Sequence, residues 1–196
     1  DETDVIVVSV EFRQGAFGWL QSKALKTGNK YTDSGNFAML DIKLALEWVR
    51  DNIGFFGGDA GNVTLSGFSA GARDSLNAMI SPIMTGLFHK VVSFSGGMTT
   101  CSKQEGRKWT DEKLAKILVR RGRFSKKKRA LRYVKRMSAK KKKKLLYSLS
   151  DKEIKKMAGS SGLRLTNFPQ CFRDGTVIPK DGFDCLEYGG YHRVPM

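Results

Sequence analysis

Apolar residues in the first hundred positions occur in short continuous runs. The runs cover Val5–Val10, Val63–Ser66 and Lys90–Ser95, and each contains valine. Runs of this length and composition are typical of strands that are buried on both faces of a parallel sheet. We therefore predict a strand at each of these three positions.

A helix is predicted in each of the two intervals between these runs. Asn36 can cap the first predicted helix. The apolar face of that helix is formed by residues at every fourth position, Leu40, Leu44 and Trp48. A second helix is predicted over residues 70–80. The order strand, helix, strand, helix, strand predicts an α/β fold with a mostly parallel central sheet and flanking helices.

The pattern changes after the third run and becomes helical and basic. We predict helices from Trp109 to Lys156, the first of them starting at Thr110. Ser150 to Glu153 has the spacing of a capping box that opens a short helix. Two narrow apolar faces accompany these helices: Leu114, Ile117 and Leu118, and then Leu145, Leu146 and Leu149. These features predict a small helical subdomain with a lysine-rich, solvated outer face.

Composition divides the chain into three parts. Residues 1–102 form the predicted α/β core segment, and residues 103–165 form the lysine-rich helical subdomain. Residues 166–196 are rich in turn-forming residues, and we predict that they lead back to the core. No capping or closing element follows Pro195, so we expect this last part to be truncated.

Positive charge is concentrated in one segment. The formal net charge is +16, and residues 103–156 hold 23 of the 35 Lys and Arg residues but only 5 of the 19 Asp and Glu. Such density can indicate contact with nucleic acid or with an anionic membrane surface. Few aromatic residues interleave with these charges, so we expect mainly a solvated helical face. We predict no specific nucleic-acid partner, and weak, salt-sensitive contact of residues 103–156 with polyanions stays open.

Length, apolar runs and cysteines limit the class of protein further. A chain of 196 residues can bury one sizeable core, and no apolar run approaches the roughly 20 residues of a membrane span. The three cysteines, Cys101, Cys171 and Cys185, favour free thiols, although a Cys171–Cys185 bridge stays open. No metal-ligand spacing is present, and we expect no metal or cofactor. The chain starts without Met, so we expect the natural start and any targeting signal to be missing, and the localisation stays open with the cytoplasm slightly favoured.

One short motif carries candidate chemistry. Gly67-Phe68-Ser69-Ala70-Gly71 has the pattern Gly-x-Ser-x-Gly between a predicted strand and a predicted helix. In such a turn the glycines let strand and helix approach, and the serine hydroxyl is lifted clear of the sheet. Ser69 is then the candidate nucleophile, and the Ala70 amide is a candidate oxyanion donor. The alternative is a glycine-rich turn with an incidental serine.

The chain resembles the type-B carboxylesterases, the family of cholinesterases and bacterial para-nitrobenzyl esterases. The resemblance covers about 130 of the 196 residues. Its ordered motifs are Val5–Val10 with Phe12-Arg13-x-Gly15-x-Phe17-Gly18, Gly35–Asp41 (GNFAMLD), Ala45–Val49 (ALEWV) with Asn52-Ile53, Phe56–Asp59 (FGGD), Asn62–Thr64 (NVT), Ser81-Pro82, Gly86–Phe88, Ser93-x-Ser95-Gly96, Asp174-Gly175-x-Val177-Ile178-Pro179 and Arg193–Pro195. The resemblance implies a partial α/β-hydrolase fold and a serine hydrolase that acts on carboxylic esters.

The chain departs from the family pattern in two ways. The family has Glu before the nucleophile and a second glycine after the alanine-glycine pair, where this chain has Phe68 and Ala72. The resemblance also implies that the glycine-rich oxyanion loop, the catalytic acid and the catalytic histidine lie outside these 196 residues. We expect neither His89 nor His192 to be the general base. Structural roles are expected for the candidate acids Asp33, Asp41, Asp59 and Asp74, with turn, cap and surface positions for most and a buried hydrogen bond for Asp41.

Two main functions follow as hypotheses. The first is a carboxylic ester hydrolase with an acyl-Ser69 intermediate and a small-molecule ester as substrate. The second is a catalytically inactive, esterase-like binding module. A weaker third hypothesis is a polyanion-binding protein that uses residues 103–156. Because a serine hydroxyl without a base is a poor nucleophile, we expect these 196 residues alone to have little or no esterase activity.

Overall fold

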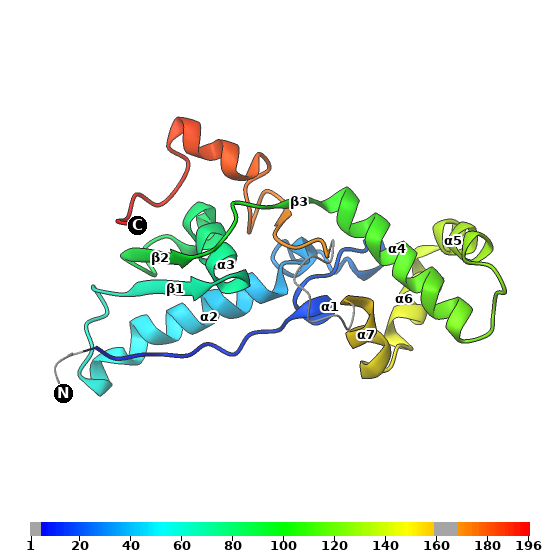
Figure 1. The fold of residues 1–196 in the computed structure, drawn as a ribbon, viewed down its shortest axis with the longest axis horizontal. Coiled ribbons are helices and arrows are strands. Elements are labelled where there is room, and N and C mark those ends of the chain that lie inside the picture. Colours follow the sequence, from blue (N-terminus) through cyan, green and yellow to red (C-terminus); the bar gives the residue numbers. More distant parts are fainter. Residues whose placement is uncertain (1–4, 159–167) are drawn as a thin grey trace. The chain divides into compact units, whose positions relative to one another are not determined.

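The computed structural model describes residues 5–158 and 168–196 of the chain. These residues belong to two compact units, each built from separate stretches of sequence (Figure 1). The sheet unit comprises Asp1–Arg13, Ala38–Thr100 and Arg173–Met196, and the helical unit comprises Gln14–Phe37 and Cys101–Phe172. The predicted boundary between residues 165 and 166 lies outside the described residues.

The sheet unit contains a strand–helix–strand arrangement. Strands β1 (Thr64–Phe68) and β2 (Lys90–Phe94) are parallel, and their register pairs Thr64 with Lys90 and Phe68 with Phe94. Helix α3 (Ala70–Ile80) and the 3-10 helix η4 (Pro82–Met84) connect them. Two of the three predicted strands and the helix over residues 70–80 are therefore confirmed, as is the parallel α/β class.

Helix α2 (Phe37–Asn52) lies where a helix was predicted, and η3 (Ile53–Phe56) follows it. The predicted apolar face was wrong, because Leu44 and Trp48 are 67% and 46% exposed. The buried stripe instead consists of Ala38, Met39, Ile42, Leu46 and Val49. The helix carries two apolar stripes, and periodicity alone does not distinguish the one that packs on the core.

The first predicted strand was also wrong. Val5–Val10 has no strand or helix assignment, and Val5 and Val7 are 70% and 83% exposed. A strand exists only when its backbone pairs with a neighbour, and no described segment pairs with these residues. A β-branched composition therefore predicts strand propensity here but not a formed ladder.

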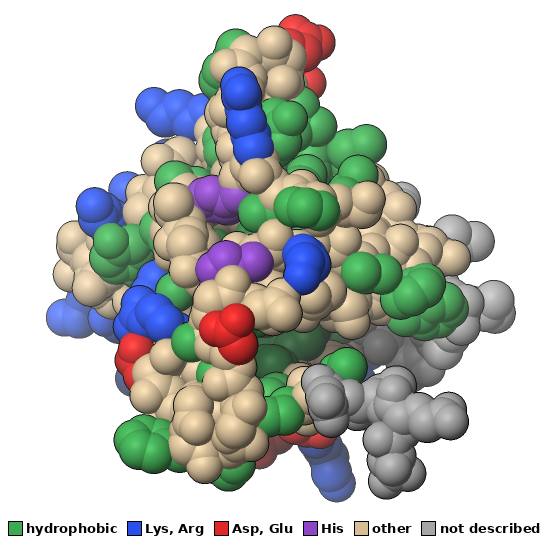
Figure 2. Space-filling model, turned by 90° about the vertical axis from the view of Figure 1, so that its left-hand side faces the viewer, with side chains coloured by type: hydrophobic (Ala, Val, Ile, Leu, Met, Phe, Trp, Pro, Cys, Tyr) green, Lys and Arg blue, Asp and Glu red, His purple; other side chains and the backbone are tan. Residues whose placement is uncertain are grey.

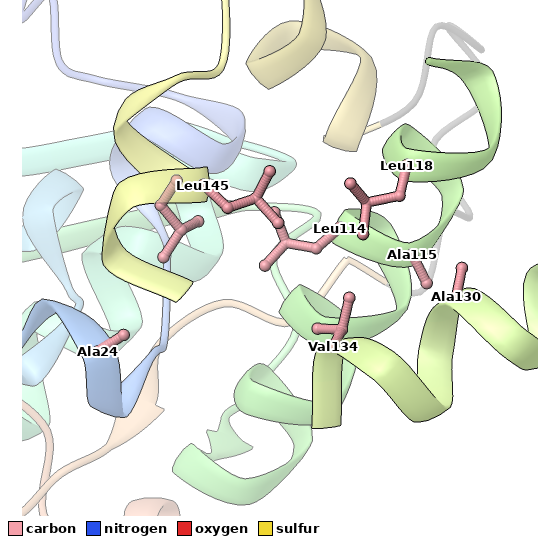
Figure 3. Packing of buried hydrophobic residues seen from close by; sticks show 8 residues of the cluster. Ala24, Leu114, Ala115, Leu118, Ala130, Val134 and Leu145 are labelled. Atoms are coloured by element: carbon pink, nitrogen blue, oxygen red, sulfur yellow. The ribbon is translucent and has the colours of Figure 1, made fainter. Parts of the chain in front are cut away.

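The helical unit confirms the helical prediction after the third run. Its long helices are α4 (Lys103–Arg120), α5 (Lys127–Arg136), α6 (Ala139–Tyr147) and α7 (Asp151–Ala158). Its short elements are α1 (Gly15–Gly18), η1 (Lys23–Leu25) and η2 (Thr32–Ser34). The two-residue strands of the chain, β3 (Cys101–Ser102) and β4 (Phe172–Arg173), form a second small sheet. Figure 3 shows the core of the unit, where Leu114 and Leu118 of α4 meet Ala130 and Val134 of α5 and Leu145 of α6.

Serine side chains cap the starts of α4, α6 and α7. Ser102 and Glu105 form a capping box at the start of α4, so the predicted start at Thr110 was wrong. Thr110 lies inside the helix, where its buried hydroxyl donates to the Gly106 carbonyl. The predicted box at the start of α7 is confirmed, because the Glu153 carboxylate accepts from the Ser150 amide at 2.9 Å. Acidic residues after a threonine, as at Thr110, are also typical of a helix start. Of these two positions, only Ser102 has the Glu three residues later that completes a capping box.

Asn36 ties together segments that are far apart in the sequence of the helical unit. Its buried side-chain amide donates to the Phe172 carbonyl at 2.9 Å, and its oxygen accepts from the Phe172 amide at 2.7 Å.

In the sheet unit, η5 (Gly182–Tyr188) is the remaining helical element. Among the described residues, no helix has the length and apolar character required to cross a membrane.

Candidate functional site

Ser69 occupies the turn between β1 and α3 in a strained backbone conformation. Its φ is +54° and its ψ is −108°, a region that residues other than glycine rarely adopt. The Ser69 amide donates to the Phe94 carbonyl at 2.8 Å, and the Ser69 carbonyl accepts from the Arg73 amide at 3.0 Å. The turn is therefore held from both sides, by the neighbouring strand and by the first turn of the helix.

Gly67 and Gly96 lie so close to the start of α3 that neither position has space for a side chain. A Cβ at Gly67 would overlap the Gly71 carbonyl and would lie 2.7 Å from the Ala72 nitrogen. A Cβ at Gly96 would lie 2.7 Å from the Ala72 Cβ. At Gly71, by contrast, an added Cβ meets nothing within 4 Å in the described part of the chain. Gly67 and Gly96 thus let β1 and the segment after β2 approach the start of α3.

The start of α3 can stabilise negative charge beside Ser69. Ala70 is the first residue of the helix, and an α-helix leaves its first four amide hydrogens without intrahelical acceptors. The helix dipole adds partial positive charge at this end, and no acidic residue stands in the first turn to offset it. Ser69 is partly exposed and Ala70 is exposed. A ligand oxygen at Ser69 could therefore accept from the Ala70 amide.

The candidate acids have structural roles. Asp74 was expected at the surface, in a turn or at a cap, but its side chain is 3% exposed and contacts Arg73 at 3.0 Å. Burial opposes ionisation of Asp41, but the hydrogen bonds from Arg13, at 2.6 and 2.8 Å, lower the pKa of the Asp41 carboxyl below its usual value. The Asp41 side chain is 24% exposed, so the buried hydrogen bond expected there is a partly exposed ion pair.

The other two acids shape loops. Asp33 accepts from the Thr27 amide at 2.7 Å and from the Gly28 amide at 3.1 Å, and these bonds, the Thr27 one first, lower the pKa of its carboxyl. Asp59 accepts from the Gly61 amide at 2.7 Å. Each therefore has the turn role that was expected of it.

Both histidines lie far from Ser69. His89 Nδ1 accepts from the Val63 amide at 3.1 Å, just before β1, whereas Ser69 follows the end of β1. A strand of five residues spans about 16 Å at its usual rise. His192 is held at the other end of α3, where its amide donates to the Met79 carbonyl at 2.9 Å and its Nε2 lies 2.8 Å from the Ser81 carbonyl. An 11-residue helix is also about 16 Å long.

The two histidine rings are seen on one surface of the protein (Figure 2). The His192 ring meets the edge of Phe88 at a centroid distance of 5.8 Å. In this arrangement neither imidazole can reach the Ser69 hydroxyl. The structure brings Gly67, Ser69 and Ala70 together but supplies them with no general base from its described residues.

Gly96 and Phe94 were not singled out from the sequence as parts of the turn. The Phe94 carbonyl accepts a hydrogen bond from the Ser69 amide, and the lack of a side chain at Gly96 allows the start of α3 to pack closely against it. Ser95 between them also has a positive φ, of +56°. The Ser95-Gly96 pair at the end of β2 was the available signal, because a glycine directly after a strand often marks close backbone approach.

No metal or disulfide accompanies the turn. Among the residues that the structure describes, no group of three or more His, Cys, Asp or Glu side chains could hold a metal ion. Cys101, Cys171 and Cys185 form no disulfide, so the Cys171–Cys185 bridge left open from the sequence is not formed.

Comparison with known proteins gives one consistent result. The model of the carboxylesterase family matches residues 1–196. Carboxylesterase 3 of Homo sapiens is 32% identical over 194 residues, which cover 98% of this chain and 30% of that protein. The para-nitrobenzyl esterase of Bacillus subtilis (strain 168) is 40% identical over 102 residues, which cover 52% of this chain and 20% of that protein.

Solved structures agree with the sequence comparisons. A structure titled PNB esterase superposes with a TM-score of 0.67 at 25% identity, covering 94% of this chain and 36% of that one. The carboxylesterase EST55 of Geobacillus stearothermophilus at pH 6.8 gives a TM-score of 0.68 at 27% identity, covering 92% of this chain and 35% of that one. The chain thus spans about a third of the length of the relatives that it matches.

Proposed function

The chain belongs to the carboxylesterase family, and we propose that it contributes the nucleophile of a carboxylic ester hydrolase, Ser69. The observation that carries this proposal is the strained, non-glycine turn at Ser69, with φ of +54° between β1 and α3. Backbone strain of this kind costs of order 1–3 kcal/mol and persists where the surrounding structure enforces it. The two hydrogen bonds of the Ser69 backbone and the close approaches at Gly67 and Gly96 provide that enforcement here.

In the proposed reaction the Ser69 oxygen attacks the carbonyl carbon of an ester. The carbonyl oxygen becomes an oxyanion that accepts a hydrogen bond from the Ala70 amide, and the positive end of the α3 dipole stabilises the same charge. The alcohol then leaves, and water hydrolyses the acyl-Ser69 intermediate. A general base must take the hydroxyl proton. Since His89 and His192 are held at the far ends of β1 and α3, we expect the base to come from residues outside this chain.

The placement of both histidines keeps a second function open. An esterase-like protein that lacks a base near its serine acts as a binding module rather than as a catalyst. The two functions differ in one measurable property. A catalyst acylates Ser69 and releases the acid product repeatedly, whereas a binding module retains ligand at the turn without covalent turnover.

The test combines covalent labelling with two serine substitutions. We expect a fluorophosphonate probe to label Ser69 in a protein that contains this chain together with an acid and a base, and Ser69→Ala to abolish both labelling and ester hydrolysis. Ser66→Ala is the matched control, because Ser66 is an exposed serine on β1 only three residues away. We expect the 196 residues alone to hydrolyse a nitrophenyl ester at little more than the rate of buffer. Hydrolysis that survives Ser69→Ala, or a label on another serine, would contradict the proposal.

A further inference from the structure

A small hollow between α4 and α7 of the helical unit gathers positive charge. On α4 the spacing of i, i+3 and i+7 places Lys113, Lys116 and Arg120 on one helix face, and α7 adds Lys156. The hollow has a volume of about 150 Å³, and its two apolar lining residues are Ile117 and Met157. Both belong to the unit's core and are only 3% and 2% exposed. Four cationic side chains, of which Lys116, Arg120 and Lys156 are exposed, therefore line a concave site with a buried apolar floor.

Two other cations of the helical unit make ion pairs. Arg121, the residue after Arg120, is bound by the Glu153 carboxylate at 2.6 and 2.7 Å. Lys142 is bound by Asp111 at 2.7 Å. By contrast, no carboxylate oxygen in the described part of the chain lies within 4 Å of the cationic groups that line the hollow. The cations of the hollow, like most of those in residues 103–156, therefore have no carboxylate partner among the described residues.

The charges in the hollow also act on each other. Burial, followed by the repulsion of Lys116 and Arg120, lowers the pKa of the Lys113 ammonium, and Glu112 offsets only part of this effect. Lys113 additionally makes a cation–π contact, with its ammonium 5.0 Å from the centroid of the Trp109 ring. Like charges that are close together raise the local electrostatic potential, so a bound anion relieves repulsion as well as forming new contacts.

We propose that this hollow is a binding site for a phosphoryl group that carries two negative charges. Its volume is smaller than the roughly 300–1,000 Å³ of sites that enclose a whole organic ligand, so it fits one charged group rather than a complete molecule. A phosphate monoester carries about −1.5 to −2 charges at pH 7 and three acceptor oxygens. The three lysines supply point charges, and Arg120 supplies the forked donors that match phosphate oxygens.

Concavity distinguishes this site from a smooth basic face. Helix α5 is strongly basic; its apolar residues Ala130 and Val134 are fully buried in the core, whereas Tyr133 is 42% exposed. A smooth basic face attracts any polyanion through the sum of its charges, with little dependence on the position of a single residue. The hollow instead requires particular residues. A free phosphate ester and a phosphorylated lipid head group present the same chemistry to it.

The experiment separates a local site from general charge attraction. Inorganic pyrophosphate is titrated into the full 196-residue chain at low ionic strength by calorimetry, and the methyl resonance of Met157 is followed by NMR. In a second arm, phosphatidylcholine vesicles with and without phosphatidylinositol bisphosphate are sedimented with the protein. Lys113→Gln/Arg120→Gln removes two charges from the hollow, and Lys116→Gln/Lys156→Gln removes the other two. The matched control, Lys135→Gln/Lys140→Gln, removes two exposed charges from α5 and α6.

We expect saturable pyrophosphate binding that shifts the Met157 methyl resonance and becomes roughly tenfold weaker in each hollow variant but changes less than twofold in the control. Binding of phosphoinositide vesicles with the same dependence on the hollow, without binding of the free anion, would assign the site to a lipid head group. Equal weakening in all three variants, or preferential binding of duplex DNA that the control impairs equally, would overturn the proposal. So would the absence of saturable binding in both arms.

Discussion

Replacing Gly67 by alanine tests whether the Ser69 turn is built as described. The new Cβ would overlap the Gly71 carbonyl and lie 2.7 Å from the Ala72 nitrogen. These atoms belong to the backbone of α3, so no side-chain rotation can relieve the contact. Overpacking of this kind typically costs 1–3 kcal/mol, and we expect the upper end, about 3 kcal/mol, because strand and helix must separate.

Gly71→Ala is the matched control for this change. The two glycines flank Ser69 symmetrically, but a Cβ at Gly71 meets nothing within 4 Å in the described residues. Gly71 is the second residue of α3, and alanine in a helix is favoured over glycine by about 0.5–1 kcal/mol. The two substitutions add the same methyl group four residues apart and should shift the free energy of unfolding in opposite directions.

The assay is urea unfolding of the two variants followed by circular dichroism at the helical band. With a slope of about 1–3 kcal/mol per M, a loss of about 3 kcal/mol lowers the midpoint by at least about 1 M. We also expect Gly67→Ala to lose fluorophosphonate labelling of Ser69 in the longer protein. A Gly67→Ala midpoint within error of the unsubstituted chain, or a Gly71→Ala midpoint lowered as far, would refute the steric account of the turn.

Three further predictions concern the helical unit. Asn36→Ala removes both bonds to the Phe172 backbone and leaves two buried backbone groups unsatisfied, so we expect a loss of about 2–4 kcal/mol by urea unfolding. The Arg121 guanidinium, followed by the Ser150 amide, lowers the pKa of Glu153 to about 2, below its ordinary 4.5. Stability from this pair is therefore present above about pH 4.5 and lost as the pH falls toward 2, and thermal unfolding of Glu153→Gln should not show that loss. Ser102→Ala should cost about 1 kcal/mol, whereas Ser102→Asp should cost little.

The sequence predicted elements whose signals are local. Residues 70–80 form the expected helix, the box at Ser150 opens α7, and two of the valine-containing runs form parallel strands. In each case the determining residues lie within one turn or one strand of the element. A capping box, for example, involves residues only three positions apart, so its chemistry can be recognised without knowledge of the rest of the fold.

The predictions that were wrong share one physical cause. Val5–Val10 has strand propensity but no described pairing partner, and the Leu44–Trp48 stripe of α2 is apolar but exposed. Hydrophobic patterning identifies residues that are favoured in a core or a sheet, but burial depends on the segment that packs against them. That segment is distant in sequence, so the hydrophobic periodicity of the element itself gives no information about it. The burial of the Asp74 side chain was not predicted for the same reason.

The same distinction between local and distant signals divides the chemistry of the proposed active site. The nucleophile depends on residues 64–80 and on the end of β2, and five consecutive residues were enough to suggest it. A general base has no such local signature, because the imidazole must approach the hydroxyl in space and can come from anywhere in the chain. The sequence offered two histidines, and their hydrogen bonds fix both about 16 Å away along β1 and α3. Labelling by a fluorophosphonate and turnover of an ester therefore both require the base as well as the turn, since a serine hydroxyl without a base is a poor nucleophile.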